Sequence, residues 1–122
     1  MRVELFVSNL QESAEFYTKV LGFLKEKETE RYISVRNGGS IIGLGAMTQL
    51  DDNHYLRQAT GSERKGVGVE IVLEVNEIEN YFRKFQDSDY PIHTGLTKRP
   101  WGTTDFRILD PDGYYLRITS RI

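Results

Sequence analysis

The chain has no cysteine in 122 residues, and this absence excludes several kinds of chemistry. Without thiols there is no disulfide, no thiolate metal ligand and no cysteine nucleophile. Long apolar runs are also missing, so no segment is expected to span a membrane, and the first residues lack the apolar stretch of a signal peptide. We therefore expect a soluble cytoplasmic protein with no membrane partner.

The charges show no strong excess of either sign. The formal net charge is −2 and the sequence pI is about 5.7, which argues against nonspecific nucleic-acid binding. Hydrophobic residues make up 39% of the chain and charged residues 28%, which is typical of a soluble globular protein. A chain of this length is expected to form one domain with its own core.

Two segments of the chain repeat the same pattern. Residues 3–23 and 71–85 each begin with an apolar strand, continue with an asparagine and a glutamate three positions later, and end in a helical periodicity. Asn9 and Asn76 have the spacing of capping-box residues and predict where the helices begin. Ser8, three positions before a glutamine, offers a second start for the first helix, and Gly22 can end it.

Three strand patterns follow each helical pattern. They lie near residues 23–28, 31–37 and 40–47 in the first half, and near 90–94, 103–109 and 113–120 in the second. The sequence thus predicts an α+β fold, a single domain over residues 1–122 with βαβββ modules at about 1–47 and 67–122. The polar connection 48–66 is long enough to be functional or mobile, and its action as a lid stays an open question.

The last two strand patterns flank a turn, Asp110-Pro111-Asp112-Gly113. Proline suits the second position of a type I turn, the first aspartate can accept hydrogen bonds from the backbone ahead, and Gly113 can adopt a left-handed conformation. These features predict a β-hairpin, which by itself indicates no function.

The tandem βαβββ pattern resembles the vicinal oxygen chelate superfamily, which includes glyoxalases, bleomycin-resistance proteins and extradiol dioxygenases. The stretches VSNLQESAEFYTKVLGF and PWGTTDFRILDPDGYYLRITS are similar to its first strand–helix signature and its closing hairpin. The resemblance implies a mixed sheet cupped around a cavity, helices outside it, and a homodimer. It leaves the activity open, because a fold does not fix a function.

In the enzymes of this superfamily a divalent metal lies inside the cup, bound by His, Glu or Gln from the first and last strands of each half. The corresponding positions in this chain are Arg2, Gly43 or Gly45, Glu70 and Arg117. Guanidinium groups and glycines cannot bind the metal, so only Glu70 is a usable ligand. A catalytic metal site needs about three protein ligands, and we therefore expect no metal and no cofactor.

Strand alternation predicts which side chains point into the cup. The expected inward residues are Arg2, Glu4 and Phe6 from the first strand, Glu70, Val72 and Glu74 from the second module's first strand, and Tyr115, Arg117 and Thr119 from the last strand. A slip of one residue in strand register would turn them outward. The set holds three glutamates and two arginines, a weak acidic excess that favours cationic ligands.

The resemblance also suggests an ion-pair cluster in place of the metal. Arg2 and Arg117 could both reach Glu70, and buried charges are stable only when they are paired. In one interpretation these pairs only close a vestigial site. In the other, an arginine binds an anionic or carbonyl oxygen of a ligand.

Aromatic and histidine residues add further candidates. Trp101 could stack on a planar or cationic ligand at the cup rim, or it could cover a sheet edge or a dimer seam. Tyr115, rather than Tyr114, is expected to line the cup. His54 and His93 match no ligand position of the superfamily and are expected to be ordinary polar residues; the alternative is that either acts as a base or as a ligand from a neighbouring chain.

The leading functional hypothesis is a metal-independent small-molecule binding protein of the glyoxalase/bleomycin-resistance type, which sequesters a planar or polar compound, including a cationic one. The candidate ligand-binding residues are Arg2, Glu4, Phe6, Glu70, Glu74, Trp101, Tyr115 and Arg117. One alternative is an enzyme, either a metal-dependent lyase or dioxygenase or a metal-free catalyst with Glu70 as base. Another is a dimer whose cup is closed and binds nothing.

Overall fold

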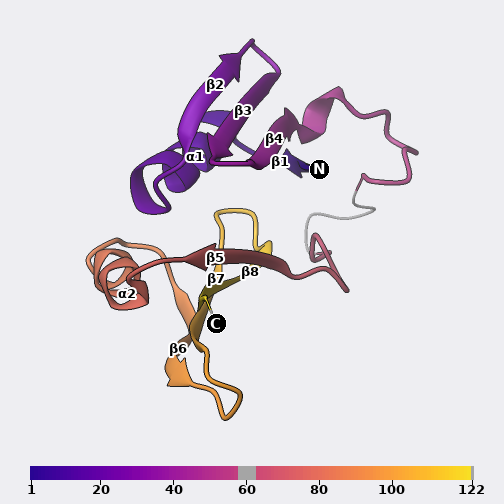
Figure 1. The fold of residues 1–122 in the computed structure, drawn as a ribbon. Helices are drawn as coiled ribbons and strands as arrows, with labels where there is room; N and C mark the ends of the chain where they lie inside the picture. Colours follow the sequence, from indigo (N-terminus) through magenta and orange to yellow (C-terminus); the bar gives the residue numbers. More distant parts are fainter. Residues whose placement is uncertain (58–62, 122) are drawn as a thin grey trace. The chain divides into compact units, whose positions relative to one another are not determined.

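The computed structural model of the protein describes residues 1–57 and 63–121. The chain forms two compact units, Met1–Glu63 and Arg64–Ile122, and each contains one four-stranded mixed sheet together with helical structure (Figure 1). This arrangement confirms the α+β fold of two βαβββ modules. In the described residues, no helix has the length and apolar character needed to cross a membrane.

The first unit follows the expected order of elements. They are β1 (Arg2–Val7), α1 (Leu10–Glu15), the π-helix η1 (Phe16–Val20), β2 (Leu24–Glu28), β3 (Tyr32–Asn37), β4 (Ser40–Ala46) and the 3₁₀-helix η2 (Met47–Gln49). The strand order is β1-β4-β3-β2, with β1 parallel to β4 and the other neighbours antiparallel. Helix α1 packs on β3 and β4, because its apolar face and one face of the sheet are both buried.

The start of α1 is the one that the capping pattern predicts. Asn9 is the N-cap, and its side-chain Oδ1 accepts a hydrogen bond of 3.0 Å from the backbone N–H of Glu12. The helical segment ends at Val20, and Gly22 lies just beyond its C-cap with a φ of 77°, which favours glycine. Ser8 therefore precedes the cap.

The second unit repeats the topology. Its elements are β5 (Ile71–Val75), α2 (Ile78–Gln86), β6 (Ile92–Lys98), β7 (Thr104–Leu109) and β8 (Tyr115–Ser120), with strand order β5-β8-β7-β6 (Figure 1). Phe82 and Phe85 of α2 pack against Phe106 of β7, with ring centroids 5.2 and 6.0 Å apart. These contacts bury one face of the sheet beneath the helix.

Two boundaries in the second unit differ from the expectation. Helix α2 begins at Ile78, and its N-cap is Glu77, not Asn76; Glu77 has a left-handed φ of 56° and makes no side-chain capping bond. Strand β6 continues to Lys98, well beyond the expected end at residue 94. Its register to β7 shifts twice, and such bulges interrupt the period-two pattern by which a strand is recognised.

The closing hairpin forms as predicted. Oδ1 of Asp110 accepts hydrogen bonds of 2.9 Å from the backbone N–H groups of Asp112 and Tyr114. The N–H of Gly113 donates to the carbonyl oxygen of Asp110 at 2.9 Å, and the φ of Gly113 is 89°. This turn fixes the register in which β7 pairs with β8.

Burial agrees with the predicted sidedness of the strands except at Thr119, an expected inward residue that is only 6% exposed. Leu5, Val7, Leu73, Val75, Leu116 and Ile118 are buried on the helix side of their sheets. Arg2, Glu4, Glu70, Val72 and Glu74 are exposed, and Phe6, Tyr115 and Arg117 are partly exposed. We call the side of each sheet that faces away from its helix the open face.

Candidate functional site

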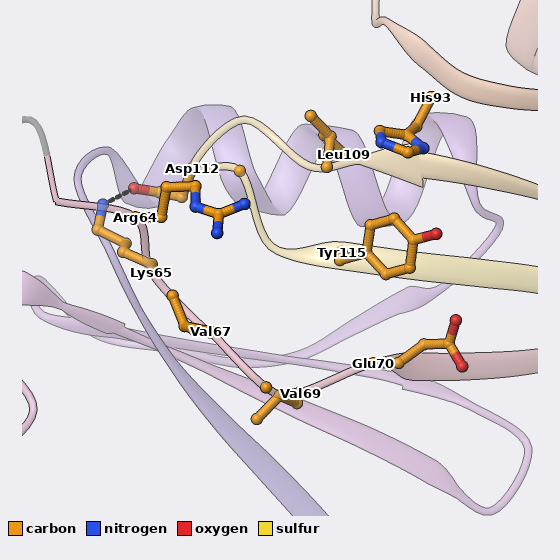
Figure 2. Close-up of a pocket in the computed structure, with 12 residues that line it drawn as sticks. Arg64, Lys65, Val67, Val69, Glu70, His93, Leu109, Asp112 and Tyr115 are labelled. Carbon is orange, nitrogen blue, oxygen red and sulfur yellow. Dashed lines mark hydrogen bonds and ion pairs between the residues drawn. The ribbon is translucent and has the colours of Figure 1, made fainter.

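The second unit contains a cavity of about 600 Å³ beside the open face of its sheet (Figure 2). The lining comes from residues 64–70, His93 of β6, Leu109 at the end of β7, the turn residues Asp112 and Gly113, and Tyr115 of β8. This volume lies in the range of small-molecule sites. Of the predicted ligand-binding residues, Glu70 and Tyr115 line it directly.

The segment before β5 forms one wall of this cavity. Lys65 makes an ion pair with Asp112 of the β7–β8 turn, and both side chains are almost fully buried (Figure 2). Gly66 has a φ of 68°, and a Cβ atom built on it would lie 2.7 Å from Cδ1 of Tyr114. The segment therefore passes so close to the Tyr114 ring that only glycine fits without a shift.

Tyr115 lies between a histidine and an arginine. Its ring meets the ring of His93 edge to face, with centroids 5.2 Å apart, and Figure 2 shows the two rings on the same side of the cavity. Its hydroxyl oxygen accepts a hydrogen bond of 3.4 Å from Nη1 of Arg107. Because that bond uses a lone pair, the hydroxyl proton can still be donated to another group.

Two arginines share the carboxylate of Glu70. Nη2 of Arg117 lies 3.3 Å from Oε1 of Glu70, and Nε of Arg107 lies 3.9 Å from Oε2. Arg107 and Arg117 are direct cross-strand partners in the β7–β8 pair. Like charges in this position repel each other, so the single carboxylate offsets only part of the local positive charge.

The expected ion pair between Arg117 and Glu70 is therefore present, and sequence reasoning missed its second arginine. Arg107 lies between Phe106 and Ile108, which are both completely buried on the helix side. The same alternation that assigned Arg117 to the open face also assigns Arg107 to it. His93, expected to be an ordinary polar residue, is part of the cavity wall.

The first unit brings Arg2 and Glu4 together. Nε of Arg2 lies 2.6 Å from Oε1 of Glu4, and the hydroxyl of Tyr32 donates to the same oxygen at 3.3 Å. Burial raises the pKa of Tyr32, and the negative charge of Glu4 raises it further. The contact expected between Arg2 and Glu70 stays a prediction.

The other predicted site residues have clear local surroundings. Phe6 packs near Gly45, where an added Cβ would lie 3.0 Å from a ring carbon of Phe6. Glu74 lies 4.0 Å from Arg121 in an exposed ion pair. Trp101 is in the turn between β6 and β7 and is 61% exposed, and it is not among the cavity-lining residues. Their roles in ligand binding stay predictions.

The donor set does not fit the superfamily's metal. A side chain at Gly43 would collide with the Glu4 carboxylate and the Tyr32 hydroxyl, so the space for a ligand from this strand is filled. In the second unit the carboxylate of Glu70 is shared by two guanidinium groups, which repel a cation. Throughout the described part of the chain, no three His, Asp or Glu side chains gather closely enough to hold a metal ion.

Comparison with known proteins places the chain in a family. Its sequence matches the model of the Glyoxalase/Bleomycin resistance protein/Dioxygenase superfamily over residues 2–118, and the chain belongs to that superfamily. No curated protein sequence matches it significantly. The resemblance inferred from the two strand–helix repeats is therefore confirmed.

Several solved structures share the fold. A glyoxalase-related enzyme from Fulvimarina pelagi has a TM-score of 0.80 and 18% identity, covering 98% of this chain and 86% of that one. A lactoylglutathione lyase from Agrobacterium tumefaciens has a TM-score of 0.74 and 16% identity, covering 98% and 91%. TioX from Micromonospora sp. ML1 has a TM-score of 0.74 and 19% identity, covering 100% and 95%. Identities this low show the fold alone.

Proposed function

We propose that the protein binds a small planar or polar molecule in the cavity of its second unit and does so without a metal ion. The observation that carries the proposal is the cavity itself. It has the volume of a ligand site, one wall formed by valines, leucine and aromatic rings, and a few polar groups, among them Glu70 and the Tyr115 hydroxyl. Pockets of this composition are typical of small-molecule sites.

Arginines stand where metal ligands would be needed, and this supports metal independence. A guanidinium group supplies positive charge and hydrogen-bond donors to an electron-rich oxygen, which is also what a Lewis-acidic metal offers. Arg117 occupies the last of the superfamily's ligand positions and is held by Glu70. Binding and orientation of a ligand oxygen follow from this geometry, and no reaction step is needed.

The expected inward residues held more glutamates than arginines, which favoured a cationic ligand, and Arg107 changes this charge balance. The open face of the second sheet carries Glu70 and Glu74, but it also carries Arg107 and Arg117, and Glu74 has its own partner in Arg121. The surroundings of Glu70 are therefore positive on balance. This supports a ligand with an electron-rich or anionic group.

An enzymatic function is the second candidate, because Glu70 lines the cavity and could serve as a base. Its carboxylate already contacts the guanidinium groups of Arg107 and Arg117, so a base at this position would first have to leave these contacts. We also propose a homodimer, in line with the exposed apolar residues Val67, Val69 and Val72. Light scattering at several protein concentrations tests this assembly.

A fragment screen on chelator-treated protein, read by amide NMR, tests the proposed function. Ligands are expected to shift the signals of residues 64–70, His93, Leu109 and Tyr115 together. Shifts scattered over the surface, or no binding by any fragment in the absence of metal, would contradict a metal-independent cavity site. Amide NMR locates binding by residue, so it separates the cavity from the open face of the first unit.

A further inference from the structure

Arg107 and Arg117 have more hydrogen-bonding capacity than the structure uses. The Nε atom of each is buried and has no hydrogen-bond partner among the described residues. A buried donor without a partner is costly, and the cost is larger for a charged group. Native proteins retain such donors when a ligand, an ion or a water molecule accepts their hydrogen bond.

The two side chains are also held in place for a ligand at the edge of the cavity. Arg117 contacts Glu70, Arg107 contacts Glu70 and the Tyr115 hydroxyl, and both of these acceptors line the cavity. The side chains of Arg107 and Arg117 are 25% and 28% exposed, so each is mostly enclosed by protein yet still reaches solvent. A mostly enclosed charge interacts more strongly with a ligand than a fully solvated one.

We propose that Arg107 and Arg117 form an oxyanion subsite, and that the ligand of this cavity is a small carboxylate with an apolar or aromatic body. This inference rests on the proposed binding function and names its ligand class. The carboxylate replaces Glu70 as an acceptor of one or both guanidinium groups, while the Tyr115 hydroxyl donates a further hydrogen bond. The apolar body lies along Val67, Val69 and Leu109.

Glu70 acts in this scheme as an internal counter-ion. Its side chain is 33% exposed, which leaves it room to move when a ligand carboxylate takes its place. One carboxylate between two cross-strand arginines leaves a charge of about +1, and a second carboxylate neutralises it. A neutral ligand of the same shape gains no such interaction.

Three probes of nearly the same shape test the inference by amide NMR titration: benzoate, benzamide and benzylammonium. Benzoate is expected to bind at least about tenfold more tightly than benzamide, because a charged hydrogen bond is worth more than a neutral one. Its affinity falls as salt screens the charges, and the benzamide affinity does not. Benzylammonium is expected to bind most weakly.

Variants assign the effect to the two arginines. Arg107→Gln and Arg117→Gln are each expected to reduce the affinity for benzoate to about the affinity for benzamide. Arg117→Lys keeps the positive charge but loses the paired N–H donors of the guanidinium group, so it reduces the benzoate affinity less. Arg83→Gln is the matched control. It removes one positive charge from α2, where Arg83 donates to Asn80 at 3.3 Å, and it leaves benzoate binding unchanged.

The outcomes separate this inference from the proposed function. Equal binding of benzoate and benzamide at the cavity would overturn the oxyanion subsite and leave the cavity site standing. Tighter binding of benzylammonium would overturn the subsite in favour of a cationic ligand. If none of the probes shifts the cavity residues in the wild-type protein, the oxyanion subsite is wrong, and the fragment screen decides the cavity proposal separately; this comparison needs no variant to fold.

Discussion

Replacing Glu70 by glutamine tests the arginine pair through stability alone. Glutamine keeps the shape of the side chain and an acceptor oxygen, but it removes the negative charge that Arg107 and Arg117 share. The two guanidinium groups then face each other across the β7–β8 pair with less compensation. The free energy of unfolding is therefore expected to fall.

The distances set the size of this effect. At 3.3 Å the Glu70–Arg117 attraction is about 1 kcal/mol in a water-like dielectric and about 5 kcal/mol at an effective dielectric constant of about 20. Glu70 is 33% exposed, so solvent screening and the desolvation of the charges reduce the net value to about 1–2 kcal/mol. For a chain of this length, this corresponds to a fall in Tm of about 3–8 °C.

Thermal unfolding followed by circular dichroism measures this change, and Glu74→Gln provides the control. Glu74 lies in β5 and loses the same charge, but its contact with Arg121 is 4.0 Å and both side chains are about 60% exposed. Its Tm is expected to stay within about 1–2 °C of the wild type. In the Glu70 variant, benzoate is expected to raise the Tm more than in the wild type, because no internal carboxylate competes with it. Equal Tm values for both variants, or a gain in stability on loss of Glu70, would show that this carboxylate does not stabilise the arginine pair.

Three further predictions follow from single contacts. Asp105→Asn is expected to lower the Tm more than Glu70→Gln in the same melting assay, because Asp105 is completely buried and accepts three hydrogen bonds from Arg99. A fall in Tm smaller than that of Glu70→Gln would contradict this expectation. The pKa of Tyr32 lies above the usual tyrosine value of about 10, and an ultraviolet pH titration compared with Tyr32→Phe measures this difference. The raised pKa contributes stability that is present below pH of about 10 and is lost as pH rises through the raised pKa of the folded protein. Gly66→Ala destabilises the protein, because the added Cβ meets the Tyr114 ring at a φ of 68°, and unchanged chemical denaturation would disprove the close approach.

Much of the fold could be predicted because buried positions recur at regular intervals in the sequence of a strand or a helix. The alternation of apolar residues in β5 and β8 places Leu73 and Ile118 under the helix, and it thereby places Arg117 on the open face. The same rule applied to β7 predicts the position of Arg107. The candidate site could therefore be predicted in part. Arg107 was missed, although the alternation of apolar residues in β7 indicates its position.

The features of the fold that could not be predicted depend on contacts that produce no regular spacing of residues in the sequence. The path of residues 64–70 is set by positive φ values at two glycines and by the pair of Lys65 with Asp112, which are 47 positions apart. The left-handed φ of Glu77 and the bulges of β6 likewise come from tertiary packing that overrides local preference. No spacing rule in a single sequence reports such contacts.

If guanidinium groups have taken the place of a metal centre, added metal ions leave the melting temperature of the protein unchanged. Chelator-treated protein is melted with Mn²⁺, Fe²⁺, Ni²⁺, Co²⁺ or Zn²⁺ added in increasing amounts, and the metal content of the untreated protein is measured alongside. No stoichiometric metal and no saturable shift in Tm are expected, because Arg107 and Arg117 contact the carboxylate that a metal would need. A saturable rise in Tm that chelator reverses, with one metal ion per chain, would contradict it.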